Sequence, residues 1–275
     1  MTAADVIIGM PEAEYHAHPA LSSTGARKIL DSPARFEYWR THPAEPKREF
    51  DLGSAIHSET LGTGYAIEVL DFKDFRTNDA KNAASDAREA GKIPVLRHVY
   101  DEVQPIAQSV LKHKTARAFF EQDGDAEATV FSTDPETGVL CRARFDFLPR
   151  PTGRRRVAFD LKSSATGVSP DSFARSVARY GYDVAQEHYL HTYDPEGAED
   201  LEFVFIAVEV EPPYLVSINA LNRDFVEIGK KKAARARRLF AACTAAKQWP
   251  GYSEDVVLLA PPVFHINDFM ENHDD

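Results

Sequence analysis

Hydrophobic and polar residues along this chain follow two different periods. In the first 122 residues, apolar positions recur at the three- and four-residue spacing of amphipathic helices. Ser22 or Ser23 is expected to cap the first helix, and Pro105 to break or kink the last. The expected helices cover residues 21–39 (as two short helices), 53–61, 76–91 and 95–120.

After residue 122 the pattern alternates between apolar and polar positions, as it does in strands. A β-hairpin is expected over residues 128–148, with its turn at 134–138. The remaining expected elements are a strand at 157–162, helices at 169–179 and 182–193, strands at 201–210 and 214–218, and a long helix at 222–247.

This order of elements predicts an α/β fold with a mixed central β-sheet flanked by helices. We expect a single domain over residues 1–275, because no linker rich in Gly, Ser or Pro divides the chain. Its expected parts are a mainly helical N-terminal part (1–122), a sheet core with the C-terminal helix (123–260) and a tail (261–275).

Composition is that of an ordinary globular protein, with 275 residues, 43% of them hydrophobic and 27% charged. Its two cysteines, Cys141 and Cys243, are too few for a disulfide framework and fit a reducing compartment. The N-terminus does not read as a secretory signal, and no apolar run is long enough to span a bilayer. A cytoplasmic protein without a membrane partner is therefore expected.

The net charge of −11 argues, taken alone, against binding nucleic acid through the overall field. Net charge averages over a whole surface, however, and an acidic exterior is compatible with a local basic track. We therefore treat the charge as a constraint on where DNA could bind.

Two aspartates and a lysine are expected to meet on one face of the sheet. Alternation around residues 142–147 predicts two faces, one with Ala143, Phe145 and Phe147 and the other with Arg142, Arg144 and Asp146. Asp160 and Lys162 point together, away from their own apolar face. If the strands are neighbours, Asp146 and Asp160 lie within reach of one cation. The simpler alternative is a solvated salt bridge between Asp160 and Lys162.

Three other features allow a structural and a functional interpretation. His57 follows a run of small residues on a helix and is either a hydrogen-bonded, half-buried histidine or a nitrogen ligand to a metal. Glu127 opens a strand and is expected to be solvated, with a further acid of the site as the alternative. Tyr182, Gln186 and Tyr189 share one helical face, which either packs its tyrosines on the sheet or contacts DNA.

In this order, the motifs resemble those of the PD-(D/E)xK nuclease superfamily. More narrowly, they are similar to the exonuclease VIII (RecE-type) nuclease domain of phages and prophages. The resemblance covers nearly the whole chain, and its short motifs share order and spacing. The matching stretches are residues 15–22, 32–34, 38–40, 51–57, 76–78, 134–142, 146 and 160–164.

The resemblance implies a fold with an αβββαβ core and a role for each matched residue. His57 matches a metal-binding histidine, and Asp146 matches the acid of the PD half. Asp160 and Lys162 match the D-x-K half, and Leu161 is expected to offer its backbone carbonyl to the metal. Mg²⁺ suits such an oxygen-rich site, and one imidazole makes Mn²⁺ acceptable.

The activity implied by the resemblance is 5′-to-3′ degradation of linear double-stranded DNA in a bacterial host cell, leaving 3′ single strands. A single-strand annealing protein then uses these strands in recombination, and homo-oligomeric rings threaded by DNA are expected. Arg142 and Arg144 are candidates for holding phosphates, and Gln186 and Tyr189 for contacting DNA. Gln186 departs from the family, whose Q-x-x-x-Y pattern becomes Q-x-x-Y in this chain.

Two alternatives stay open. The first is a related nuclease of another polarity or substrate; the Cas4-like type usually needs four cysteines for an iron–sulfur cluster, and this chain has two. The second is a catalytically idle DNA-binding or interaction module that keeps the nuclease fold.

Overall fold

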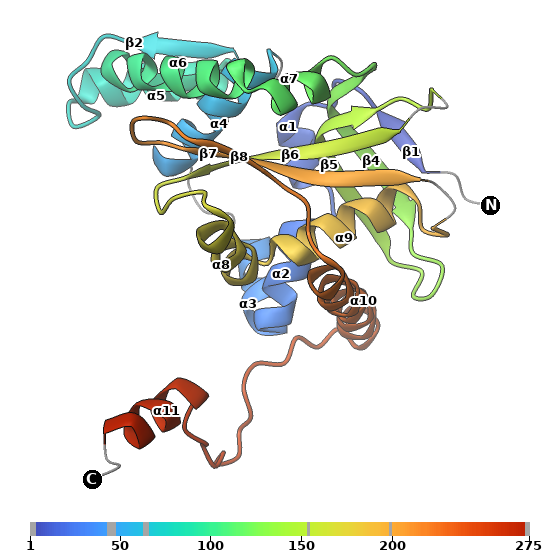
Figure 1. Ribbon diagram of the computed structural model, residues 1–275. Coiled ribbons are helices and arrows are strands. Elements are labelled where there is room, and N and C mark those ends of the chain that lie inside the picture. The colour runs from blue at the N-terminus through green and yellow to red at the C-terminus, as the bar shows by residue number, and fades with distance from the viewer. Residues whose placement is uncertain (1–3, 43–47, 63–65, 153–154, 198–199, 273–275) are drawn as a thin grey trace.

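A computed structural model describes residues 4–42, 48–62, 66–152, 155–197 and 200–272. Its centre is a six-stranded sheet in which β6 and β7 run parallel and the other neighbours antiparallel (Figure 1). In spatial order the strands are β1 (Asp5–Ile7), β4 (Gly124–Thr133), β5 (Leu140–Pro149), β6 (Arg156–Ser164), β7 (Leu201–Glu209) and β8 (Val216–Asn219).

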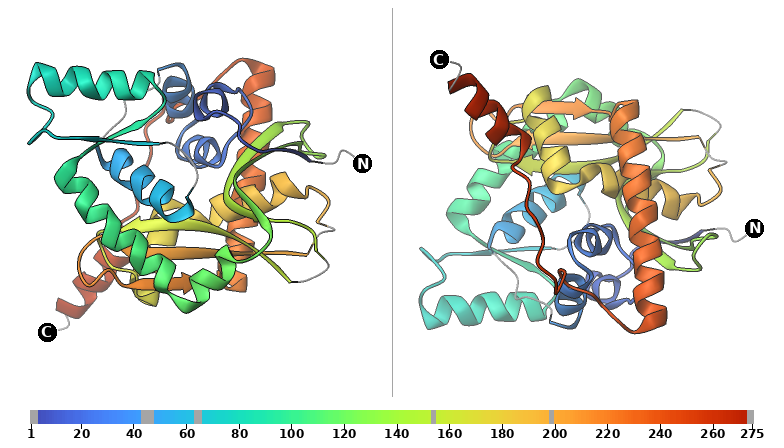
Figure 2. Two further views of the ribbon diagram at one scale, coloured as in Figure 1. Left: turned by 90° about the horizontal axis from the view of Figure 1, so that it is seen from above. Right: turned by 90° about the horizontal axis from the view of Figure 1, so that it is seen from below.

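Helices cover both faces of this sheet (Figures 1 and 2). One face carries α4 (Arg48–Leu61), α6 (Arg97–Lys112) and α7 (Lys114–Phe120). The other carries α8 (Pro170–Tyr180) and α9 (Tyr182–Tyr193), with α2 (Ser23–Asp31), α3 (Pro33–Thr41) and α10 (Arg223–Ala246) packed beyond them.

The remaining elements lie at the periphery. The short strands β2 (Ile67–Leu70) and β3 (Ile93–Leu96) form a separate parallel pair against α5 (Asn78–Glu89). The N-terminal α1 spans Glu12–Ala17, and the last helix, α11, spans Val263–Asn272. Within the described ranges, no helix combines the length and apolar composition needed to cross a bilayer.

The mixed sheet flanked by helices is confirmed, and so is the local chemistry that starts its first helices. Ser22 caps α2 by accepting a hydrogen bond from the Gly25 N–H at 3.1 Å. Ser32 caps α3 in the same way, with Pro33 as the first helical residue. The order β4–β5–β6, then α8 and α9, then β7 gives the βββαβ part of the expected core, because a parallel partner for β6 requires a crossover.

Several expectations for the N-terminal part were wrong. The sequence pattern gave no sign of β1, α1 or β2, and residues 95–96 belong to strand β3, where a helix was expected to begin. Pro105 lies inside α6, and the break comes later, at His113. The buried apolar stripe of α6 continues through Pro105, from Val103 to Val110, and holds this helix on the sheet.

The predicted faces of β5 hold only in part. Ala143 and Phe145 pack on the α9 side of the sheet, whereas Phe147 packs on the α6 side, stacked on Phe159 with ring centroids 5.1 Å apart. The prediction that Phe147 shares their face is therefore wrong. On the neighbouring strand, Glu127 adopts a left-handed φ of 54°, which bends the chain between the two regions.

A glycine allows α9 and α10 to approach closely. A Cβ atom on Gly229 would lie 2.5 Å from the Asp183 carbonyl oxygen, which is rigid backbone. We expect Gly229→Ala to lower the free energy of unfolding by about 2–3 kcal/mol, measured by urea denaturation. Gly53→Ala is the matched control, because its nearest neighbour would be 4.0 Å away, and it should leave stability equal or slightly higher. Equal stability of the two variants would contradict the prediction.

Candidate metal centre

The candidate centre lies where β5 and β6 separate. The one residue pair assigned between these strands is Phe147–Phe159, and Leu161 lies two residues beyond it on β6. The peptide groups of Leu161 bond to side chains. Its N–H donates to Asp146 Oδ2 at 2.6 Å, and its carbonyl accepts from His57 Nε2 at 2.7 Å. The Leu161 peptide therefore belongs to the site while its side chain is buried in the core.

Strand register places three carboxylates in a row across β4, β5 and β6. Glu127 lies opposite Asp146, because its two chain neighbours pair with the residues on either side of Asp146. Asp160 lies opposite Asp146 on the other side, one step beyond the Phe147–Phe159 pair. Asp146 and Asp160 are both buried. Such a row repels itself unless protons or cations lie between its members.

His57 reaches this row from the opposite layer. Ala55 and Ile56 are fully buried under the sheet and fix α4, so that the following imidazole enters the gap between β5 and β6. His57 Nδ1 lies 3.3 Å from Asp146 Oδ2. A proton or a metal ion between these two atoms would satisfy both of them.

Lys162 pairs with Asp160 through its ammonium group, which also lies 5.3 Å from the centroid of the Tyr182 ring. Burial acts to lower the pKa of Lys162, but the carboxylates of Asp160 and Asp146 outweigh it and hold this pKa above its usual value. Lys162 therefore stays charged, and its fixed position suits it to orient a water or to stabilise an anion.

Glu127 is the residue whose role sequence reasoning underestimated. Its ligand atoms and those of His57 and Asp146 all lie within 4.8 Å of one another, a group that could hold a metal ion. Burial, together with the charge of Asp146, raises the pKa of Glu127 to about 8. The side chain is 28% exposed, so the expectation of a solvated glutamate was wrong. The sequence offered one signal for this role: the position of the hairpin turn sets the register of β4 and β5, and that register places Glu127 opposite Asp146.

Burial also raises the pKa of Asp146; the neighbouring His57 opposes this shift and Asp160 adds to it. The donor set is one imidazole, three carboxylates and one backbone carbonyl, which are ligands that Mg²⁺ and Mn²⁺ accept. The residues of this centre therefore fit a divalent cation, and all the residues expected to hold it contact one another or lie in one row.

Arg142 and Arg144 hold the N-terminal segment, and Arg144 also lies beside the centre, with its Nε 4.0 Å from Glu127 Oε2. The Arg142 guanidinium donates to the carbonyls of Tyr15 and His18, and Arg144 donates to the Met10 carbonyl at 2.7 Å. Both guanidinium groups also lie over the Tyr15 ring, at 4.8 and 4.5 Å from its centroid. A phosphate contact by either arginine stays a prediction, and the structure shows each of them already bound to protein groups.

The helix face with Tyr182, Gln186 and Tyr189 turns inward. Both tyrosines pack against phenylalanines of the sheet, as the structural interpretation expected. Gln186 is 5% exposed, and its amide donates to Glu187 at 3.0 Å. Burial raises the pKa of Tyr189 well above its usual value, with the nearby charge of Asp160 contributing. The structure does not bring Gln186 to the metal centre, and contact of either residue with DNA stays a prediction.

The raised pKa of Glu127 predicts how stability depends on pH in the metal-free protein. Between its ordinary value of 4.5 and about 8, the folded state binds a proton that the unfolded state releases. Stability therefore falls as pH rises through this window. We expect Glu127→Gln to reduce the fall, measured as urea unfolding free energy in EDTA at about pH 5 and about pH 8. The exposed Glu196→Gln should behave as wild type, and an unchanged pH dependence in Glu127→Gln would contradict the prediction.

This fold, with two aspartates and a lysine at the opening between central strands, defines a protein of the PD-(D/E)xK class. The family model "PDDEXK-like domain of unknown function (DUF3799)" matches residues 22–260. The chain therefore belongs to this PDDEXK-like family, and the superfamily resemblance of its sequence is confirmed at this level.

A solved structure has the same fold. A crystal structure named "Putative exonuclease" from Eubacterium rectale is 12% identical, with a TM-score of 0.58, and the match covers 94% of this chain and 95% of the other. A phage related exonuclease from Haemophilus somnus is 10% identical, with a TM-score of 0.34, over 84% of this chain and 97% of the other. No curated protein sequence matches.

Proposed function

We propose that the protein is a metal-dependent exonuclease that degrades linear double-stranded DNA from 5′ ends. The remaining 3′ single strands would serve recombination by a single-strand annealing protein. One observation carries the hydrolytic part of the proposal: the Leu161 peptide, two aspartates and Lys162 converge where β5 and β6 separate. The proposed 5′-to-3′ polarity, the annealing partner and a homo-oligomeric ring of this protein rest on the sequence resemblance.

Asp146, Asp160, the Leu161 carbonyl and His57 would hold the cation, with Glu127 as a further carboxylate ligand. A bound Mg²⁺ or Mn²⁺ would bind the scissile phosphate, lower the pKa of the attacking water and offset charge on the leaving oxygen. The residues themselves position these groups. The Leu161 N–H fixes the Asp146 carboxylate, and α4 fixes the His57 ring.

Lys162 would place the attacking water. Its ammonium is held between the Asp160 carboxylate and the Tyr182 ring, which restricts where a hydrogen-bonded water can sit. The pKa of Lys162 is held above its usual value in the metal-free protein, and in cleavage this side chain would act as a hydrogen-bond donor and a positive charge. Such preorganised charge stabilises an anion that forms during phosphodiester cleavage.

The test uses linear and circular duplex DNA, with linear substrates labelled at either the 5′ or the 3′ end. We expect the full chain to degrade linear DNA in Mg²⁺ or Mn²⁺, to release 5′ label first and to spare the circle. EDTA and Asp160→Ala should each abolish degradation. Asp171→Ala, which removes an exposed acid on α8, is the matched control and should cleave as wild type.

Cleavage, end polarity and the exonuclease mode are tested by separate readouts of this experiment. No cleavage of any DNA in either metal would contradict the enzyme and favour an idle module. Early release of 3′ label, or cutting of the circle, would contradict the polarity or the exonuclease mode and favour a related nuclease of the same fold.

A further inference from the structure

The C-terminal arm, which we define as residues 253–272, exposes an unusual amount of apolar surface. Eighteen large hydrophobic residues are exposed among the described residues, and nine of them lie in this arm. Val256 is 101% exposed and Leu258 is 98% exposed. Monomeric soluble proteins seldom leave large contiguous apolar patches in water, so this concentration indicates a surface that another molecule covers.

The residues just before the arm, 250–252, which we call its root, are fixed to α3, and the arm itself leaves the body of the protein (Figures 1 and 2). The Ala34 N–H donates to the Pro250 carbonyl at 3.1 Å, and the Arg35 guanidinium lies 5.5 Å from the centroid of the Tyr252 ring. Beyond this root the described residues of the arm are exposed up to Glu271. These contacts direct the chain along α3 and outward.

The helix α11 within the arm carries a typical docking pattern. Val263, Ile266 and Met270 follow one another at i, i+3 and i+7, and therefore share one helical face. All three are exposed. Helices that bind apolar grooves present anchors at this spacing.

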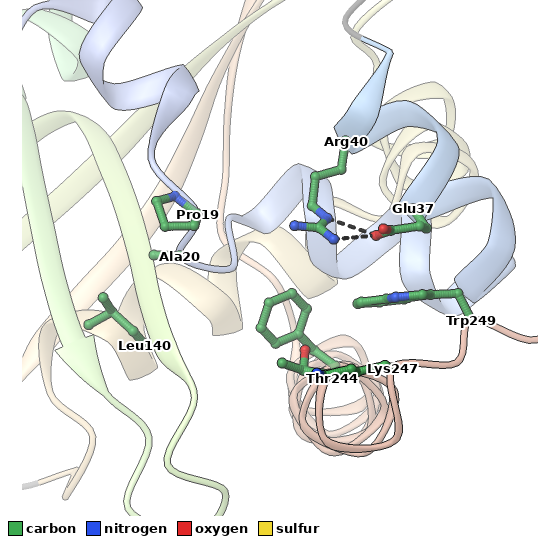
Figure 3. Close-up of a pocket in the computed structure, with 9 residues that line it drawn as sticks. Pro19, Ala20, Glu37, Arg40, Leu140, Thr244, Lys247 and Trp249 are labelled. Atoms are coloured by element: carbon green, nitrogen blue, oxygen red, sulfur yellow. Dashed lines mark hydrogen bonds and ion pairs between the residues drawn. The ribbon is translucent and has the colours of Figure 1, made fainter.

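A pocket of about 640 Å³ lies near the start of the arm, between the first residue of β5 and the end of α10 (Figure 3). It is lined by Pro19, Ala20, Glu37, Arg40, Leu140, Phe240, Thr244, Lys247 and Trp249. Its apolar walls come from aliphatic and aromatic side chains. Arg40 is bound to Glu37 at 2.8 Å, whereas the exposed Lys247 has no ion-pair partner among the described residues.

The arm and the pocket are complementary in charge as well as in apolar character. The arm contains Glu254, Asp255, Asp268 and Glu271 and no lysine or arginine. The pocket offers two cationic side chains against one acid. An acidic, apolar segment therefore suits this pocket better than a basic or neutral one.

We propose that the arm of one copy of this chain docks in this pocket on a second copy. A chain's own arm starts at the pocket rim, beside Trp249, and leaves on the side away from Pro19 and Leu140 (Figure 3). An arm of 20 residues approaches the roughly 20–30 residues that each partner contributes to a stable interface. The proposal deepens the homo-oligomeric part of the proposed function by naming the two contact surfaces, and it does not depend on the nuclease activity.

Because the arm and the pocket are different surfaces, the contact is heterologous. Each copy donates an arm to one neighbour and receives an arm from another. Such contacts close into a ring when the rotation between copies permits, and otherwise continue as a filament. An oligomer with a fixed number of copies would therefore indicate a closed ring, and assemblies of unlimited length would indicate a filament.

The first test is sedimentation of the full chain over a range of concentrations. We expect wild type to associate, and Val263→Ser with Ile266→Ser to weaken association at least tenfold. Lys247→Glu should weaken it in the same direction. The control is Leu215→Ser with Ile228→Ser, which removes two similarly exposed residues outside the arm and should change nothing.

The second test maps the contact with a short thiol cross-linker, since Cys141 and Cys243 are buried. Two differently tagged chains, one with Leu140→Cys and one with Val263→Cys, should form a mixed adduct. Three results would overturn the proposal: a monomeric wild type, association that persists in the arm variant, or cross-linking only within a single chain that carries both cysteines.

Discussion

Replacement of Lys162 by methionine is expected to reduce DNA cleavage at least ~10³-fold, because the variant loses the positive charge beside the reacting phosphate. The metal-free protein should also lose stability, because Asp160 is 4% exposed and would lose the ammonium group that pairs with it. Breaking a fully buried pair costs about 3–5 kcal/mol. The Lys162 side chain is 26% exposed, so we expect a loss of about 2 kcal/mol.

Saturating divalent cation should restore the stability of Lys162→Met, because it offsets the charge of Asp160. Cleavage should stay reduced, because a cation held by the carboxylates does not replace the ammonium group beside the reacting phosphate. Single-turnover cleavage and urea unfolding, each with Mg²⁺ and with EDTA, measure the two effects. Lys232→Met is the matched control, because Lys232 pairs at 3.0 Å with the buried Asp183 away from the centre. It should lose stability and keep cleavage. Full activity in Lys162→Met would exclude the proposed role of this lysine.

The variant Asp146→Asn is expected to lose cleavage by a similar or larger factor and to gain stability. The asparagine oxygen can still accept the Leu161 N–H, so the local geometry is kept. The negative charge that repels Asp160 and Glu127 disappears. Because burial raises the pKa of Asp146, its ionisation above that pKa opposes folding, and removal of the charge stabilises the metal-free protein near neutral pH.

Thermal unfolding in EDTA and in Mg²⁺ tests this expectation. The melting temperature of Asp146→Asn should exceed that of wild type in EDTA, and Mg²⁺ should raise it less than it raises wild type. Asp134→Asn is the opposite control. Burial opposes ionisation of Asp134, but hydrogen bonds from Thr137 and the charge of Arg237 outweigh it and hold its pKa below the usual range. That variant should lose stability and keep cleavage.

The regular alternation of side chains along strands allowed much of this centre to be predicted. Period-two alternation placed Asp160 beside Lys162 and opposite the apolar face of β6, and both are found there. The family resemblance added His57 and the Leu161 carbonyl, which the structure joins by a hydrogen bond. These features depend on local pattern or on a known motif.

The features that could not be predicted depend on contacts between distant segments. The left-handed backbone of Glu127 changes which face the neighbouring residues occupy, and no residue type announces that bend. Phe147 follows the bend to the other layer. Arg142 and Arg144 bond to backbone carbonyls of the N-terminal segment, which also adds β1 to the edge of the sheet. The sequence of that segment did not predict a strand, so these contacts could not be predicted either.

The side chain and the peptide group of Leu161 have separate roles. Its side chain is fully buried among the apolar residues under α4 and α6, whereas its peptide group contacts Asp146 and His57. Any residue type supplies the same peptide. Exchange among leucine, isoleucine and valine at this position can therefore adjust packing without altering the ligand, while an error in the path of β6 would displace the ligand whatever the side chain.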